Sequence, residues 1–143
     1  MNHKLKTHNY TCGFTLIEIL VAATLIALLS TIGISGYQAI TRSGRDAIRK
    51  ADLEQVRSAL EIYKAENNSY PVDSSCNPSG LVPNYLNKLP TDPKSPDYSY
   101  CYVRDSTLTY HLCAHLENGD SSELCSAGNC GSGVVCNYRI SNP

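Results

Sequence analysis

The sequence has no tryptophan, one phenylalanine and one methionine, and long apolar runs are scarce outside a single stretch near its start. Its aromatic side chains are almost all tyrosines, ten in number, which suit half-buried strands with one solvent-facing edge. The part of the chain beyond the apolar stretch is therefore expected to have a thin core. A length of 143 residues allows one domain.

An excess of charge of one sign is also missing, because 12 Lys and Arg are balanced by 13 Asp and Glu. This balance gives no electrostatic signal for a nucleic-acid site. No catalytic constellation stands out either. His111, Cys113 and His115 would line one strand face, where their spacing suits packing better than a thiol nucleophile with its base. We therefore expect a protein that is not an enzyme and needs no cofactor.

The apolar stretch runs from Phe14 to Ile34 and contains a single charged residue, Glu18. About 20 apolar residues in a helix can cross the roughly 30 Å hydrocarbon core of a membrane. A carboxylate at the centre of such a helix costs about 2.5–3.5 kcal/mol on insertion scales, so it usually has a partner. The sequence predicts a membrane helix with one acidic group awaiting a partner.

The residues Gly13-Phe14-Thr15-Leu16-Ile17-Glu18 resemble the processing site of type IV pilins and of the pseudopilins of type II secretion systems. The resemblance implies that a prepilin peptidase cuts after Gly13 and methylates the new amine of Phe14. It also implies that Glu18 pairs with the N-terminal amine of a neighbouring subunit during assembly. An ordinary secretory signal fits poorly, because its cleavage site follows the apolar region; a signal anchor with a chance glutamate is the alternative.

One long helix is expected from Phe14 to about Asn67, ended by the Asn67-Asn68-Ser69-Tyr70-Pro71 segment. Gly33 and Gly36 lie near the outer end of its apolar half, where each glycine costs about 1 kcal/mol relative to alanine. The family often has a proline near this point, and its filaments melt the helix there. We hypothesise that Gly33 and Gly36 allow melting here, although close helix packing explains two glycines equally well.

The second half of this helix is amphipathic. An apolar stripe at i+3 and i+4 spacing is expected to pack on a sheet; it consists of Ile48, Ala51, Val56, Ala59, Leu60, Ile62 and Tyr63. Arg42, Arg45 and Arg49 lie close to one another on the helix, and we assign them to a solvated face. The alternative is that they pair with lipid phosphates or with acidic residues of a neighbouring subunit.

A proline-rich loop, residues 71–97, and a set of strands follow the helix. The run Asn-x-Ser-Tyr-Pro, Leu-Val-Pro-x-Tyr-Leu and Leu-Pro-x-Asp-Pro resembles the loop of short pilins and major pseudopilins, which implies contacts with neighbouring subunits. Tyr98–Arg104 and Leu108–Leu116 predict an antiparallel hairpin whose leucine face lies on the helix. Residues 134–140 predict the last strand.

Six cysteines lie beyond the leader, and an even number in a small exported region indicates up to three disulfides. The sequence does not choose among the possible pairings of Cys76, Cys101, Cys113, Cys125, Cys130 and Cys136. Free buried thiols, or a zinc site at His111, Cys113 and His115, are the alternatives.

The segment 117–121 is expected to be a plain turn. Related pseudopilins often bind calcium in a loop after these strands, and Glu117, Asn118 and Asp120 could supply oxygen ligands. We nevertheless expect no metal.

Together these features predict an α+β fold of the type IV pilin kind, with a long N-terminal helix on a small antiparallel sheet and a disulfide-bonded C-terminal region. The expected divisions are a leader (1–13), a membrane or filament-core helix half (14–38) and a head (39–143). The expected function is a type IV pilus structural subunit that forms a helical homopolymer. Its expected partners are the prepilin peptidase, membrane lipid and an inner-membrane assembly platform. A major pseudopilin and a non-polymerising, membrane-anchored binding module are the alternatives.

The expected location is the inner membrane, as a single-pass protein with a cytoplasmic N-terminus, and later the cell-surface pilus. The distribution of basic residues opposes this orientation. Lys4 and Lys6 precede the span, whereas Arg42, Arg45, Arg49 and Lys50 follow it. The processing motif and the cysteines, which need an oxidising exterior, favour the cytoplasmic N-terminus.

Overall fold

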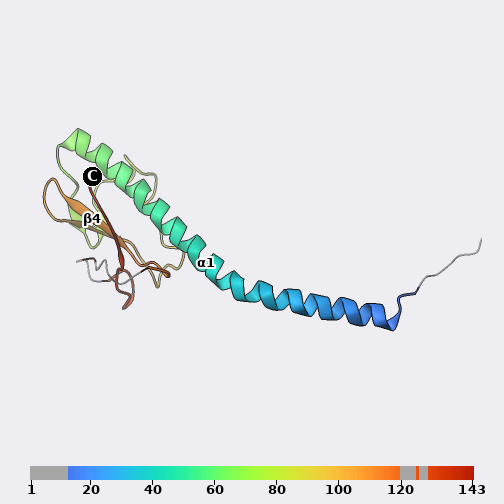
Figure 1. Ribbon diagram of the computed structural model, residues 1–143. Coiled ribbons are helices and arrows are strands. Elements are labelled where there is room, and N and C mark those ends of the chain that lie inside the picture. Colours follow the sequence, from blue (N-terminus) through green and yellow to red (C-terminus); the bar gives the residue numbers. More distant parts are fainter. Residues whose placement is uncertain (1–12, 120–124, 126–128) are drawn as a thin grey trace, which may run out of the picture. The chain divides into compact units, whose positions relative to one another are not determined.

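The computed structural model describes residues 13–119, 125 and 129–143. The chain divides into two compact units, the first ending at Gln38 and the second spanning Ala39–Pro143. One helix, α1 (Leu16–Asn67), contributes residues to both units (Figure 1). The predicted long helix is thus confirmed, beginning two residues after Phe14.

The first unit contains the apolar half of α1, and no other described residue of the unit buries its side chains. Its described side chains are exposed, including Phe14, Leu16 and Ile26. Among the described residues, α1 is the one helix long and apolar enough to cross a membrane.

α1 ends where the sequence predicts. Asn68 has a left-handed backbone with φ 56°, and its N–H donates to the carbonyl of Lys64 at 2.8 Å. Asparagine tolerates this conformation better than most residues, so it closes the last turn of a helix readily.

The second unit has its core between α1 and a sheet. Leu53, Val56, Ala59 and Leu60 of α1 are buried there, and so are several residues from the loop and strands: Tyr70, Leu81, Leu86, Tyr102, Tyr110, Leu112 and Ala114. The predicted stripe is therefore right at Val56, Ala59 and Leu60. It is wrong at Ile48, Ala51 and Ile62, which are exposed, and it missed Leu53, which is fully buried.

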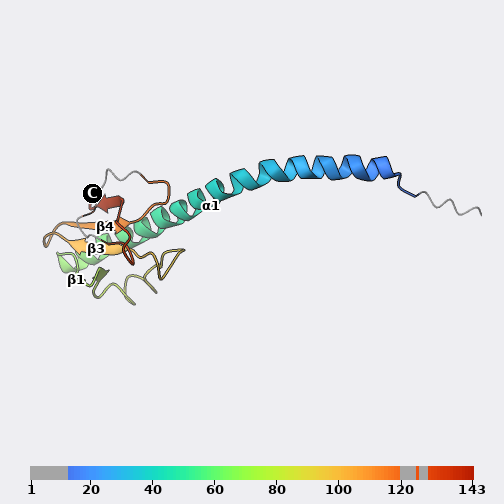
Figure 2. The ribbon, with the colours of Figure 1, turned by 90° about the horizontal axis from the view of Figure 1, so that it is seen from below.

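The sheet has the order β3-β4-β5, all antiparallel: β3 (Cys101–Arg104), β4 (Tyr110–Ala114) and β5 (Tyr138–Ser141). Cys101 pairs with Cys113, and Leu112 pairs with Ile140. Figure 2 shows β3 and β4 beside the second half of α1. A small ribbon of β1 (Asp73–Ser74) and β2 (Asn77–Pro78) lies in the proline-rich loop.

β4 is buried on both faces. Leu112 faces the core on α1, as predicted for the leucine face, whereas Leu108 lies beyond the strand and is exposed. The opposite face packs in a second cluster made of cysteines. Three disulfides join Cys76 to Cys101, Cys113 to Cys125 and Cys130 to Cys136. The predicted disulfide-bonded C-terminal region is thus present.

Candidate processing and assembly site

The predicted processing residues precede α1 and are accessible. Gly13 is exposed, and a Cβ built on it would meet no atom within 4 Å. Phe14 is 81% exposed. A peptide bond that a peptidase must reach needs this kind of openness, because the enzyme has to surround the scissile backbone.

Glu18 lies in the first turn of α1 and forms a capping box with Thr15. The Thr15 N–H and hydroxyl donate to Glu18 Oε2 at 3.2 and 3.1 Å. The Glu18 N–H donates to Thr15 Oγ1 at 3.3 Å. This reciprocal pair satisfies amides at the helix start, and the helix dipole favours the negative charge there. The Thr-x-x-Glu spacing is visible in the sequence and could have predicted the cap.

The two candidate melting residues, Gly33 and Gly36, lie inside α1. The helix is unbroken across them. A Cβ added at either position would meet no atom within 4 Å. Melting in an assembled filament stays a prediction.

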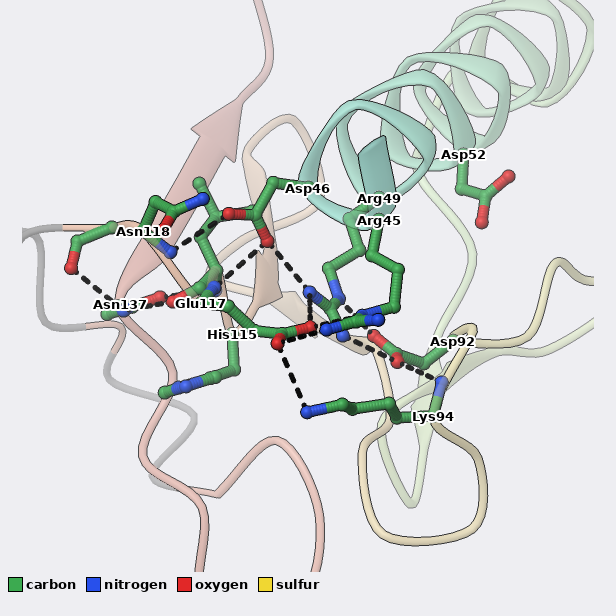
Figure 3. Close-up of polar contacts among 12 residues, drawn as sticks. Arg45, Asp46, Arg49, Asp52, Asp92, Lys94, His115, Glu117, Asn118 and Asn137 are labelled. Carbon is green, nitrogen blue, oxygen red and sulfur yellow. Dashed lines mark hydrogen bonds and ion pairs between the residues drawn. The ribbon is translucent and has the colours of Figure 1, made fainter. Parts of the chain in front are cut away.

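The second unit contains a buried cluster of charges centred on Arg49, whose side chain is fully buried (Figure 3). Its Nε and Nη2 donate to the two oxygens of Asp92 at 2.7 and 3.0 Å. Its Nη1 donates to Asp46 at 2.7 Å and to Glu117 at 3.1 Å. One guanidinium therefore joins α1 to the proline-rich loop and to the turn after β4.

Glu117 is the second centre of this cluster. It accepts hydrogen bonds from Nε and Nη2 of Arg45, both at 2.6 Å, and from Nζ of Lys94 at 3.1 Å. Asp46 holds the backbone of the same turn, because its carboxylate accepts hydrogen bonds from the backbone N–H groups of Glu117 and Asn118, each at 2.9 Å.

These contacts shift the proton affinities of the cluster. Hydrogen bonds from Arg45, Lys94 and Arg49 outweigh partial burial and hold the pKa of Glu117 well below its usual range. Burial lowers the pKa of Arg49, but hydrogen bonds to Asp92, Asp46 and Glu117 more than compensate, so that pKa is raised. The guanidinium of Arg49 and the ammonium of Lys94 also lie 5.3 and 5.0 Å from the ring centre of Tyr98.

The assignment of the arginines to a solvated face was wrong for Arg49 and Arg45. Arg42 is exposed, but Arg45 is half-buried against Glu117 and Arg49 is fully buried. One signal was available, because Arg49 precedes Leu53, Val56 and Leu60 at helical spacing on the core face. Its partners Asp92 and Glu117 are distant in the sequence, so no local pattern identifies them.

The residues considered for metals have other partners. The carboxylate of Glu117 is taken by cationic side chains, Asn118 belongs to the turn fixed by Asp46, and Asp120 lies outside the described residues. Cys113 is bonded to Cys125, which leaves no thiolate at that position. Nδ1 of His111 lies 2.8 Å from Asp105 Oδ2, and Nδ1 of His115 lies 2.8 Å from the carbonyl of Val135.

Comparison with known proteins places these features in context. A sequence profile of the prokaryotic N-terminal methylation motif matches residues 8–34. Type II secretion system core protein G of Pseudomonas aeruginosa is 30% identical over 132 residues, covering 82% of this chain and 93% of that protein. The type IV wide pilus major component PilA4 of Thermus thermophilus is 31% identical over 107 residues, covering 75% of each chain. Core protein G of Escherichia coli is 27% identical over 99 residues, or 60% of this chain and 68% of that protein. No solved structure gives a significant match.

Proposed function

Since this chain belongs to the family of type IV pilins and type II secretion pseudopilins, we propose that it is a structural subunit of a type IV pilus. In this proposal it is cleaved after Gly13, methylated at Phe14 and polymerised into a helical surface filament. The observation that supports polymerisation most directly is the uncovered apolar half of α1. Burial of apolar surface stabilises by about 25 cal/mol per Å², so this segment belongs first in a bilayer and then against other copies.

Glu18 supplies the chemistry of assembly. Cleavage after Gly13 frees a positively charged amine on Phe14, which pairs with the Glu18 carboxylate of an adjacent subunit. In low dielectric this attraction is far stronger than in water, so it offsets the cost of burying the carboxylate and sets the axial register. The Thr15 cap supports the mechanism, because it holds Glu18 at the end of the helix nearest the cleavage site.

The disulfides support export of the head to an oxidising compartment. The three bonds close loops with sequence separations of 25, 12 and 6 residues in a head with a thin core. Covalent closure of this kind suits a domain that faces the oxidising exterior. A filament of these subunits would serve motility, adhesion or DNA uptake.

The second candidate is a major pseudopilin of a type II secretion system. It is favoured by the match to core protein G of Pseudomonas aeruginosa, which extends over 93% of that protein. A membrane-anchored module that never polymerises is disfavoured, because it would leave Glu18 without an intersubunit partner.

Both candidates share the same pathway at the membrane. The chain first crosses the inner membrane once, with its N-terminus in the cytoplasm and its apolar helix in lipid. It meets the prepilin peptidase there, and then the assembly platform. The domain divisions follow the same logic: a leader to residue 13, a filament-core helix half from 14 to 38, and a head from 39 to 143.

Mass spectrometry of material sheared from the cell surface tests the proposal. We expect an abundant peptide that starts at N-methylated Phe14. A mature peptide found only in membranes would favour the pseudopilin. A chain that keeps residues 1–13 would overturn both candidates.

Glu18→Ala tests the assembly step separately. The variant should insert in the membrane at the wild-type level and yield no filament. Glu54→Ala is the matched control, because Glu54 is an exposed glutamate of the same helix, beyond its apolar half. A normal filament yield from Glu18→Ala would contradict the mechanism.

A further inference from the structure

The bond between Cys76 and Cys101 is the most exposed of the three disulfides. Cys76 is partly exposed, although Cys101 is buried. The other two bonds join cysteines that are all buried: Cys113, Cys125, Cys130 and Cys136. Exchange of a disulfide with a thiol requires that the attacking thiolate reach one of the two sulfurs. Burial of both cysteines opposes this approach at two of the bonds but not at the third.

A cavity of about 190 Å³ lies beside this bond, and both Cys76 and Cys101 line it. An apolar cavity of about 150 Å³ is large enough to hold a molecule of the size of benzene, so a small thiol fits. Buried Leu53 is one of the apolar lining residues, whereas Thr91 and Ser99 line the cavity and are exposed. The cavity therefore offers a route from solvent to the disulfide.

The cavity has no uncompensated charge. Among the described residues that line it, Asp92 is the one with a charged side chain. Both of its carboxylate oxygens accept hydrogen bonds from Arg49, at 2.7 and 3.0 Å. A free carboxylate would repel an approaching thiolate, and this pairing removes that repulsion. A ligand with a fixed charge of its own would find no counter-charge there, so the cavity suits an otherwise neutral thiol.

The backbone around Cys76 also favours opening of this bond. Ser75 and Cys76 form the two-residue turn between β1 and β2, and both have positive φ angles, 51° and 66°. Turns of this kind ordinarily contain Asn and Gly, because a side chain with a Cβ rarely adopts a positive φ. Once the bond is cleaved, the turn can relax, and disulfides that are strained or exposed are the more easily exchanged ones.

The surroundings of the bond can accept the products of cleavage without unfolding of the head. Sγ of Cys101 lies 3.9 Å from the carbonyl oxygen of Tyr102, which can accept a hydrogen bond from a thiol at that position. The N–H of Tyr102 donates to the carbonyl of Cys76 at 2.9 Å, and the N–H of Ser79 donates to the carbonyl of Val72 at 3.0 Å. These backbone contacts hold the small ribbon against β3 independently of the disulfide.

We propose that the Cys76–Cys101 bond is a thiol–disulfide exchange site, at which a small neutral thiol enters the cavity and becomes attached to Cys76. The thiolate attacks Sγ of Cys76, the bond between the two cysteine sulfurs breaks, and Cys101 leaves as a thiolate that takes a proton from water. A second thiolate then attacks the sulfur of the first thiol, which leaves as a symmetric disulfide while Cys76 takes a proton. The two thiols thus supply both electrons. The inference concerns the head and holds for a pilus subunit and a pseudopilin alike.

Peptide mapping of the full chain in detergent tests the site, with 2-mercaptoethanol as the thiol. The reaction is stopped with N-ethylmaleimide at successive times, and the cysteine peptides are identified by mass spectrometry. We expect the Cys76–Cys101 bond to be lost at least tenfold faster than either other disulfide. The first product should contain 2-mercaptoethanol on Cys76 and N-ethylmaleimide on Cys101. Equal loss of all three bonds, or the adduct on Cys101, would overturn the inference.

A pair of tryptophan substitutions tests the route through the cavity. Thr91 and Thr107 are both exposed, but Thr91 lines the cavity and Thr107 does not. We expect Thr91→Trp to slow cleavage of the Cys76–Cys101 bond at least threefold, because the indole obstructs the cavity, and Thr107→Trp to stay within 1.5-fold of wild type. Wild-type cleavage in Thr91→Trp would overturn entry through the cavity. If a variant fails to fold, the mapping of the wild-type chain still decides which bond and which sulfur react.

Discussion

Arg49 shows how a single buried side chain ties this head together. Its guanidinium bonds Asp92 from the proline-rich loop, Asp46 from α1 and Glu117 from the turn after β4. Burying these ions costs solvation, and their mutual hydrogen bonds offset that cost. Removing a single member of such a cluster is strongly destabilising, because the remaining charged groups are left buried without a counter-charge.

We expect Arg49→Leu to destabilise the head by about 3–5 kcal/mol, since it leaves Asp92, Asp46 and Glu117 without their shared cation. Thermal unfolding of the full chain in detergent, followed by the near-UV signal of its tyrosines, measures the loss. Arg57→Leu is the control, because Arg57 pairs at 3.3 Å with the exposed Glu54, and such pairs contribute about 0–1 kcal/mol. Equal effects of the two substitutions would contradict a structural role for the cluster.

Glu117 makes the head sensitive to acid. Its pKa is lowered in the folded state, chiefly by hydrogen bonds from Arg45, so the stabilisation is present above the ordinary glutamate pKa of about 4.3. It is lost as the pH falls from there toward the lower, folded-state pKa. We expect a melting temperature that changes little between pH 7 and about pH 5 and falls in more acidic buffer. Glu117→Gln should melt lower at pH 7 and show a shallower acid decline; an unchanged decline would assign the acid sensitivity to other groups.

Features that depend on neighbouring residues could be predicted from the sequence, whereas ion pairs between residues far apart in the chain could not. The processing motif and the end of the helix at Asn67 depend on neighbouring residues, so both could be predicted. The burial of Arg49 depends on Asp92 and Glu117, which lie 43 and 68 residues further along the chain. An isolated arginine on a helix is usually solvated, and only the fold brings these carboxylates to it.

The strands were also predicted correctly in kind, but their first residues were not. Alternation predicted the hairpin, but β3 begins at Cys101 and not at Tyr98, because Tyr98 bridges to Gly131 outside the sheet. The last strand was expected over 134–140, yet β5 begins at Tyr138. Val135 pairs instead with Asn129, and Cys136 is bonded to Cys130. A disulfide between nearby cysteines therefore holds these residues in a separate small loop.

The apolar half of α1 belongs to the first unit and its amphipathic half to the second. Gly33 and Gly36 lie near the boundary at Gln38. Gly33 and Gly36 each lower helix stability by about 1 kcal/mol relative to alanine. We expect hydrogen exchange of assembled filaments to show rapid exchange across residues 32–37. A Gly33→Ala and Gly36→Ala double variant should protect these amides and shorten the extension of filaments under force. Full protection of residues 32–37 in wild-type filaments would contradict the melting hypothesis.

The exposed apolar surface and the buried core of this chain lie in different units. Both clusters of buried residues and all three disulfides lie within Ala39–Pro143. The first unit contributes exposed apolar side chains instead. In the sequence, the one apolar run and the cysteines occupy different parts of the chain. The disulfide pairing could not be predicted, because not even strand adjacency decides it: Cys101 and Cys113 are cross-strand neighbours, yet Cys101 is bonded to Cys76 and Cys113 to Cys125.

We therefore expect residues 39–143, expressed without the first unit in an oxidising compartment, to form a soluble monomer with a near-UV tyrosine signal, while the full chain needs detergent. Each disulfide of such a small region typically contributes about 2–4 kcal/mol, which is large against the 5–15 kcal/mol total stability of a domain. Addition of dithiothreitol should accordingly lower the melting temperature sharply or abolish the transition. Size-exclusion chromatography and circular dichroism, with and without reductant, measure both effects. An aggregated oxidised fragment would show that the head depends on the apolar helix to fold, and an unchanged transition after complete reduction would show that its thin core is sufficient without the disulfides.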